Sequence, residues 1–66
     1  MKITINGRDT TIEGMLSLEE VVFLFLKNYQ AVIVELNGEI IPKDKMMDIQ
    51  VNEGDSIELI QFVGGG

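Results

Sequence analysis

The C-terminal segment of the sequence, QFVGGG, contains the residues that could support chemistry. Three glycines, Gly64, Gly65 and Gly66, follow large apolar residues. No cysteine or lysine occurs in this segment, so the α-carboxylate of Gly66 is the one group at this end to which another group could be covalently attached. Glycine lacks Cβ and reaches backbone conformations forbidden to other residues, so a glycine tail can enter a narrow channel on another protein. We therefore expect Gly66 to carry a covalent group, and bulk at Gly65 or Gly66 to block entry.

The composition argues against an enzyme that works by itself. Sixty-six residues make one domain, and a domain of this size buries only about 60% of the surface of its unfolded chain. The absence of cysteine excludes disulfides and thiolate chemistry, and the absence of histidine removes the commonest general base and metal ligand. Asp44 and Asp48 have no histidine, metal motif or hydroxyl partner, so we set paired-carboxylate catalysis aside. We expect no catalytic residue, no metal site and no cofactor bound by the chain itself.

Charge and hydropathy limit the partners. Eleven acidic residues against five basic ones give a net charge of -6, which repels phosphate backbones and anionic membranes. The N-terminal segment MKITINGRDT has no apolar core of signal-peptide length. The longest apolar run, residues 21–26, is far shorter than the ~20 residues of a membrane span. We therefore expect a cytoplasmic protein that binds neither nucleic acid nor membrane.

Two Asn-Gly pairs predict β-hairpins, because this dipeptide tolerates positive φ in a two-residue turn. The pairs are Asn6-Gly7 and Asn37-Gly38, and a further turn is expected at residues 52–55. These turns and the helix described next separate five extended segments: residues 2–5, 9–13, 32–36, 39–41 and 56–63. Pro42 ends the fourth segment, because proline cannot donate a hydrogen bond to a neighbouring strand. The fifth segment directly precedes the glycines.

One helix is predicted between the two hairpins. Ser17 and Glu20 have the spacing of a capping box, so the helix should start at about Leu18. Five apolar or aromatic residues follow helical spacing and should face the sheet: Leu18, Val21, Val22, Phe25 and Tyr29. Phe23 and Leu24 fall outside this stripe, and we expect them to be exposed without a functional role.

The order of the elements predicts an α+β, β-grasp (ubiquitin-like) fold. Its mixed four- to five-stranded sheet would carry one main helix on one face, with the first and last strands as a parallel central pair. We expect the segment KDKMMD to form one irregular or helical turn, with Met46 and Met47 filling the edge of the core. Residues 1–63 would form a single domain, and residues 64–66 a flexible glycine tail. Because one fold can serve many functions, the fold alone does not identify the function of this chain, and the glycine tail is the feature that can.

Four landmarks make a family resemblance specific. They are LNGEIIP at residues 36–42, VNEGDSIEL at residues 51–59, the segment around Gln61, and the terminal Gly65-Gly66. With these landmarks the whole chain resembles the ThiS-type sulfur carrier proteins of thiamine biosynthesis. Two features depart from the pattern: Gly64 stands where Ala or another small residue is expected, and the helix is unusually rich in Phe and Leu. Neither departure affects the reactive end.

The resemblance implies a carrier that a separate enzyme activates. In such families an E1-like adenylyltransferase (ThiF-type) uses ATP and Mg to adenylate the C-terminal carboxylate, here that of Gly66. Sulfur from a donor such as a cysteine desulfurase then displaces the adenylate to give a thiocarboxylate, which feeds a thiazole synthase (ThiG-type). Two alternatives remain open: the small subunit of molybdopterin synthase, which uses the same adenylation, and a ubiquitin-like interaction module or protein-conjugating modifier.

Alternation along the last strand predicts a docking surface beside the tail. Successive side chains of a strand point to opposite faces of the sheet, so one set of alternate residues should face the helix and the other should face out. The inward set is Ile57, Leu59 and Gln61, and the outward set is Glu58, Ile60 and Phe62. We expect the outward set to dock the activating enzyme, unless a loop or neighbouring side chains cover it. The carboxylates of Glu53, Asp55 and Glu58 would steer the carrier to a basic patch on that enzyme, or would simply be solvated.

Overall fold

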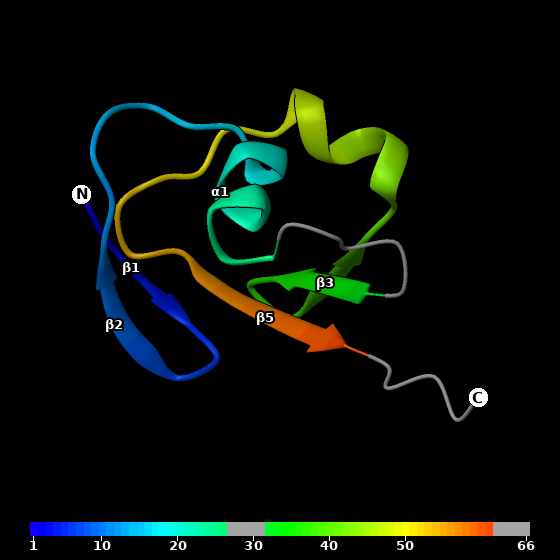
Figure 1. Ribbon diagram of the computed structural model, residues 1–66, viewed down its shortest axis with the longest axis horizontal. Coiled ribbons are helices and arrows are strands. Elements are labelled where there is room, and N and C mark those ends of the chain that lie inside the picture. The colour runs from blue at the N-terminus through cyan, green and yellow to red at the C-terminus, as the bar shows by residue number, and fades with distance from the viewer. Residues whose placement is uncertain (27–31, 62–66) are drawn as a thin grey trace.

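A computed structural model describes residues 1–26 and 32–61, which form one mixed sheet with helices on one of its faces (Figure 1). In chain order the elements are β1 (Lys2–Ile5), β2 (Arg8–Thr11), α1 (Leu18–Phe25), β3 (Val32–Leu36), β4 (Glu39–Ile41), the 3-10 helix η1 (Lys43–Asp48) and β5 (Ser56–Gln61). The strand order is β2-β1-β5-β3-β4. β1 and β5 run parallel, whereas β1 with β2, β3 with β4 and β3 with β5 pair antiparallel. The β-grasp arrangement expected from the sequence is confirmed.

Both predicted Asn-Gly hairpins are present. Asn6 and Gly7 have φ values of 51° and 80°, and Asn37 and Gly38 have values of 52° and 88°. Positive φ at both central residues gives a turn whose twist matches that of the flanking strands. β2 is Arg8–Thr11, so the predicted segment 9–13 was placed slightly too far along the chain.

The helix begins where the capping box predicts. Ser17 Oγ accepts a hydrogen bond from the Glu20 N–H (3.1 Å), and Glu20 Oε1 accepts one from the Ser17 N–H (2.9 Å). The side chains of Leu18, Val21 and Val22 are fully buried against the sheet. These three confirm the first part of the predicted stripe.

Phe25 lies on the predicted side of the helix, where it lines a groove with Ile5 and Leu59, but it is not buried there. α1 ends at Phe25, and the next residue, Leu26, is already extended (φ -134°, ψ 110°). Phe25 is 45% exposed and lies at the last turn of the helix, beyond the closely packed part of the core. Tyr29 lies outside the described residues. Phe23 and Leu24 are exposed, as expected.

The core lies between the sheet and the layer formed by α1 and η1. Among residues 1–26 and 32–61 it contains eleven buried apolar residues: Ile3, Ile5, Ile12, Leu18, Val21, Val22, Val32, Val34, Met46, Val51 and Ile57. Met46 is fully buried, as predicted, whereas Met47 is 63% exposed, so that part of the prediction was wrong. Consecutive side chains of a 3-10 helix point about 120° apart, so η1 can turn only one of the two methionines toward the core.

Candidate functional site

β5 is the central strand of the sheet and the last element of the described chain (Figure 1). On one side β5 pairs with β3 along its length, as far as the Val32–Gln61 pair. On the other side the β1 ladder stops at the Ile5–Ile57 pair. The predicted tail residues Phe62, Gly64, Gly65 and Gly66 lie outside the described residues, so their roles stay predictions. The structure therefore defines the strand that precedes the tail.

Two turn asparagines fix the position of β5. Beyond the end of β1, the Leu59 N–H donates a hydrogen bond to Asn6 Oδ1 (2.8 Å), while the Asn6 N–H donates to the Ile57 carbonyl (2.9 Å). At the start of β5, the Ser56 N–H donates to Asn37 Oδ1 (2.9 Å). Each asparagine thus supplies the positive φ of a hairpin turn and also hydrogen-bonds to the central strand.

The turn before β5 uses two of the three carboxylates considered for steering. Asp55 Oδ2 accepts a hydrogen bond from the Asn52 N–H (2.7 Å), and Asp55 Oδ1 accepts one from Asn37 Nδ2 (3.1 Å). Glu53 Oε1 accepts a hydrogen bond from the Lys2 N–H (2.9 Å). The Gly-Asp turn of the VNEGDSIEL segment and the asparagine of LNGEIIP are therefore joined by side-chain contacts that shape the entry to β5.

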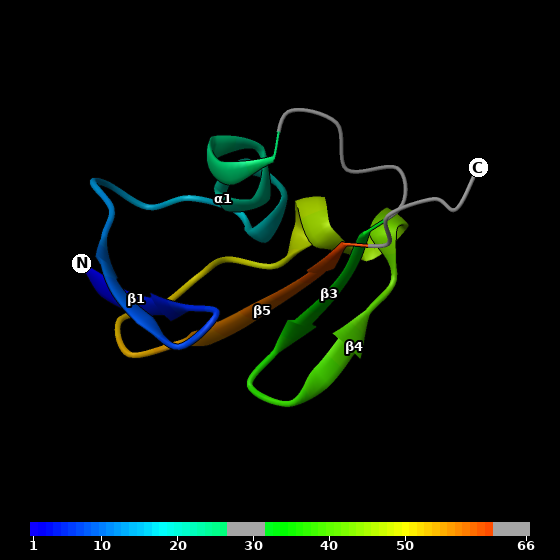
Figure 2. The same ribbon diagram turned by 60° about the horizontal axis from the view of Figure 1, so that its bottom comes forward.

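The sheet has one face opposite α1 (Figure 2), and the burial pattern of β5 places its outward residues on that face. Glu58 is exposed, and Ile60 is 43% exposed, whereas Ile57 is fully buried on the other face. This confirms the predicted alternation for the described part of the strand. Whether Glu58 and Ile60 dock a partner stays a prediction.

Three further residues extend this face, and sequence reasoning missed them. Ile33 lies opposite Ile60 in the ladder, and Glu35 lies opposite both Glu58 on β5 and Ile40 on β4. Alternation within residues 32–36 could have assigned Ile33 and Glu35 to this side, because Val32 and Val34 are buried. We call the set Ile33, Glu35, Ile40, Glu58 and Ile60 the outer face.

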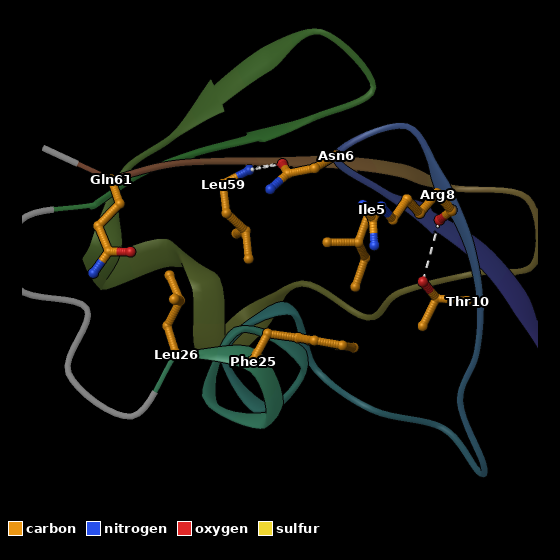
Figure 3. Close-up of a pocket in the computed structure, with 8 residues that line it drawn as sticks. All are labelled: Ile5, Asn6, Arg8, Thr10, Phe25, Leu26, Leu59 and Gln61. Atoms are coloured by element: carbon orange, nitrogen blue, oxygen red, sulfur yellow. Dashed lines mark hydrogen bonds between the residues drawn. The ribbon is translucent and has the colours of Figure 1, made fainter.

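A groove lies on the other side of the sheet, between the end of α1 and β5 (Figure 3). Its volume is about 590 Å³, and its apolar walls come from α1, β1 and β5. The lining residues are Ile5, Asn6, Arg8, Thr10, Phe25, Leu26, Leu59 and Gln61. Among these, Arg8 is the only charged side chain, so the groove offers no pair of groups for acid-base or nucleophilic chemistry.

The described residues contain no cluster of three or more histidine, cysteine, aspartate or glutamate side chains placed to hold a metal ion. Asp44 and Asp48, set aside above, are exposed in η1. Within residues 1–26 and 32–61, no helix has the length and apolar character needed to cross a membrane. The features that define the site are the central strand that precedes the tail and the outer face.

Known proteins share both the sequence pattern and this architecture. The profile of the ThiS family matches residues 3–66. The sulfur carrier protein ThiS of Bacillus subtilis is 35% identical over 71 residues, a match that covers 97% of this chain and 98% of that protein. A thiazole synthase of Paramagnetospirillum magneticum is also 35% identical, over 66 residues. This second match covers the whole chain but only 20% of the synthase, so the chain spans about a fifth of that relative.

A solved structure agrees over the full length. The crystal structure of the thiamine biosynthesis protein ThiS from Geobacter metallireducens superposes with a TM-score of 0.85 at 35% identity, covering 100% of both chains. Its likeness to this protein therefore extends to the whole β-grasp sheet. Together with the profile match and the Bacillus relative, it shows that the chain belongs to the ThiS family.

Proposed function

We propose that this protein is a sulfur carrier of thiamine biosynthesis whose C-terminal carboxylate is activated and converted to a thiocarboxylate. The observation that carries the proposal is the family match, which runs through the glycine tail to Gly66. The Bacillus relative, covered over 98% of its length, is a sulfur carrier protein. This kinship favours the thiazole pathway over the molybdopterin and interaction-module alternatives.

The proposed chemistry begins with a poor electrophile. Charge and resonance protect the carbonyl carbon of the Gly66 carboxylate, so sulfur cannot replace its oxygen directly. An E1-like adenylyltransferase would let a carboxylate oxygen attack the α-phosphorus of ATP, with Mg bound by that enzyme, and pyrophosphate would leave. The acyl adenylate then has AMP as a good leaving group. The persulfide of a donor such as a cysteine desulfurase would displace AMP to give an acyl disulfide, and a thiol would then reduce this disulfide, releasing the thiocarboxylate and forming a new disulfide with the donor sulfur.

The carrier itself would contribute geometry and a thin tail. Asn6 and Asn37 hold β5 in place, so the globular part presents the chain in a defined direction. Gly64 and Gly65 have no side chains to obstruct a narrow channel on the enzyme. Ordering a glycine tail on binding has an entropic cost, which contacts made by the folded domain would offset. We assign those contacts to Ile60, Glu58 and Phe62.

A thiazole synthase is the proposed acceptor of the sulfur. The support is the match to the Paramagnetospirillum thiazole synthase, a fifth of which resembles this chain. A domain of this type therefore occurs in one polypeptide with that activity. The carrier thiocarboxylate would supply the sulfur atom of the thiazole, while the carrier itself performs no catalysis.

Carrier-dependent exchange of labelled pyrophosphate into ATP tests the activation step without any sulfur donor. With an E1-like enzyme of the ThiF type, we expect exchange to require the full-length carrier, because pyrophosphate leaves only when the carboxylate attacks ATP. A variant that lacks Gly66 should fold normally, since the buried core residues among the described part of the chain end at Ile57, and should lose exchange. Equal exchange with the full-length and truncated proteins would contradict the proposal.

A further inference from the structure

Two glutamates of like charge face each other at the centre of the outer face. Glu35 on β3 and Glu58 on β5 are direct partners in the antiparallel ladder. Like charges in this position destabilise a sheet, whereas a neutral or opposite-charge pair would not. Within residues 1–26 and 32–61, neither carboxylate has a hydrogen-bond or ion-pair partner. The free protein therefore holds a charge arrangement that an added cation would improve.

Apolar side chains surround this pair of carboxylates. The next pair toward the tail on the same face is Ile33 with Ile60, two residues or roughly 7 Å along the strands. On the other side of Glu35, Ile40 is its direct neighbour on β4 and is 65% exposed. A carboxylate pair bordered by exposed isoleucines has the composition of a protein-binding surface, with an apolar part and a charged part.

We propose that Glu35 and Glu58 together bind one arginine guanidinium of the activating enzyme, while Ile33, Ile40 and Ile60 pack on an apolar surface around it. This inference rests on the proposed function. Arginine fits because its planar fork of donors can hydrogen-bond two carboxylates at once and is less strongly hydrated than an ammonium group. On the enzyme, the apolar surface that packs on Ile33 and Ile60 should then lie next to the channel for the tail. The arginine should lie roughly 7 Å further from that channel, because Glu35 and Glu58 are two residues further along the strands.

Charge complementarity selects the activating enzyme as the occupant. That enzyme must bring a chain of net charge -6, together with its terminal carboxylate, close to the triphosphate of ATP. Coulomb repulsion opposes this approach unless cationic groups on the enzyme compensate it. The outer face includes two residues of β5, the strand that leads to the tail, so it is well placed to meet those groups as the tail enters.

The arrangement predicts opposite effects on stability and on binding. Removing one charge of the pair relieves repulsion in the free protein and should raise its Tm by roughly 1–5 °C. The same change removes one partner of the guanidinium and should weaken binding to the activating enzyme roughly tenfold or more. A residue that only stabilises the fold could not show this combination.

The experiment measures Kd for the activating enzyme and the Tm of four variants: Glu35→Gln, Glu58→Gln, the double variant and Glu39→Gln. Glu39 is an exposed glutamate paired with Leu36 on the opposite side of the sheet, so Glu39→Gln controls for the change in net charge. We expect both single variants to lose affinity and the control to change little. If one guanidinium binds both carboxylates, the double variant loses less than the product of the two single losses.

Several results would overturn the proposal. If both single variants bind the activating enzyme as tightly as Glu39→Gln does, no cation of the enzyme is bound by the two carboxylates. If the variants weaken binding to the thiazole synthase alone, the face belongs to that partner instead. A lower Tm in the variants would show that the carboxylates stabilise the free protein. Binding is measured without ATP, so it does not depend on the activation step. A tight complex that requires Glu35 but in which the C-terminal carboxylate is never adenylated would support this proposal and contradict the proposed function.

Discussion

The two faces of the central sheet use the same strands for different purposes. On the face covered by α1 and η1, Ile57, Val34 and Ile3 are nearly or fully buried. On the outer face, the alternate residues Ile60, Ile33 and Glu35 stay exposed or half-buried. A period of two along a strand thus separates the residues that stabilise the fold from those available for recognition. Substitutions on the two faces should therefore affect different measurements.

The largest expected effect compares two isoleucines of β5 that differ mainly in the face they occupy. Ile57→Ala removes a fully buried side chain from the core and should lower the free energy of unfolding by about 2–5 kcal/mol, through lost burial and the cavity left behind. Ile60→Ala makes the same chemical change at a position that is 43% exposed and should cost less than about 1 kcal/mol. Urea unfolding of both variants checks this, and equal losses would contradict the division between the faces.

A second substitution tests the outer face in binding. Ile60→Asp places a charge within the apolar part of that face and should weaken binding to the activating enzyme roughly tenfold or more, because the carboxylate would have to be desolvated in the complex. The far-UV circular dichroism spectrum should be unchanged. The matched control is Leu24→Asp, at an exposed position of α1. Unchanged affinity in Ile60→Asp would remove this residue from the docking surface.

A smaller effect is expected at Asn37, which braces β5 without belonging to either face. Asn37→Gly keeps a residue suited to φ 52° but removes the hydrogen bonds to Ser56 and Asp55, and should cost about 1 kcal/mol of stability. Asn37→Ala also loses tolerance of positive φ, so it should cost more than Asn37→Gly. Thermal unfolding separates the two contributions. A glycine variant as stable as the wild type would show that the side-chain bonds contribute nothing.

Local signals in the sequence predicted much of the fold. The two Asn-Gly turns and the Ser17–Glu20 capping box depend on residues close together in the chain, and each appears as expected. Alternation also placed Glu58 and Ile60 on the exposed face, because a strand fixes the direction of each side chain. These features need no knowledge of the tertiary structure.

The predictions that failed or were incomplete depend on contacts between distant segments. Helical spacing placed Phe25 on the side that faces the sheet, but its exposure depends on how closely the end of α1 packs against β1 and β5. The choice between Met46 and Met47 depends on how η1 packs on α1. The pairing of Glu35 with Glu58 follows from the register of β3 and β5, strands that a long stretch of chain separates. No local pattern determines that register.

The most direct test of the sulfur-carrier function is the mass of the intact chain after incubation with the activating enzyme, MgATP and a sulfur donor. A parallel sample without ATP is the control. We predict an ATP-dependent increase equal to the replacement of one oxygen atom by sulfur, and fragmentation should locate it at Gly66. An unchanged mass with several ThiF-type enzymes, or sulfur located on any other residue, would contradict a carrier that works through its C-terminal carboxylate.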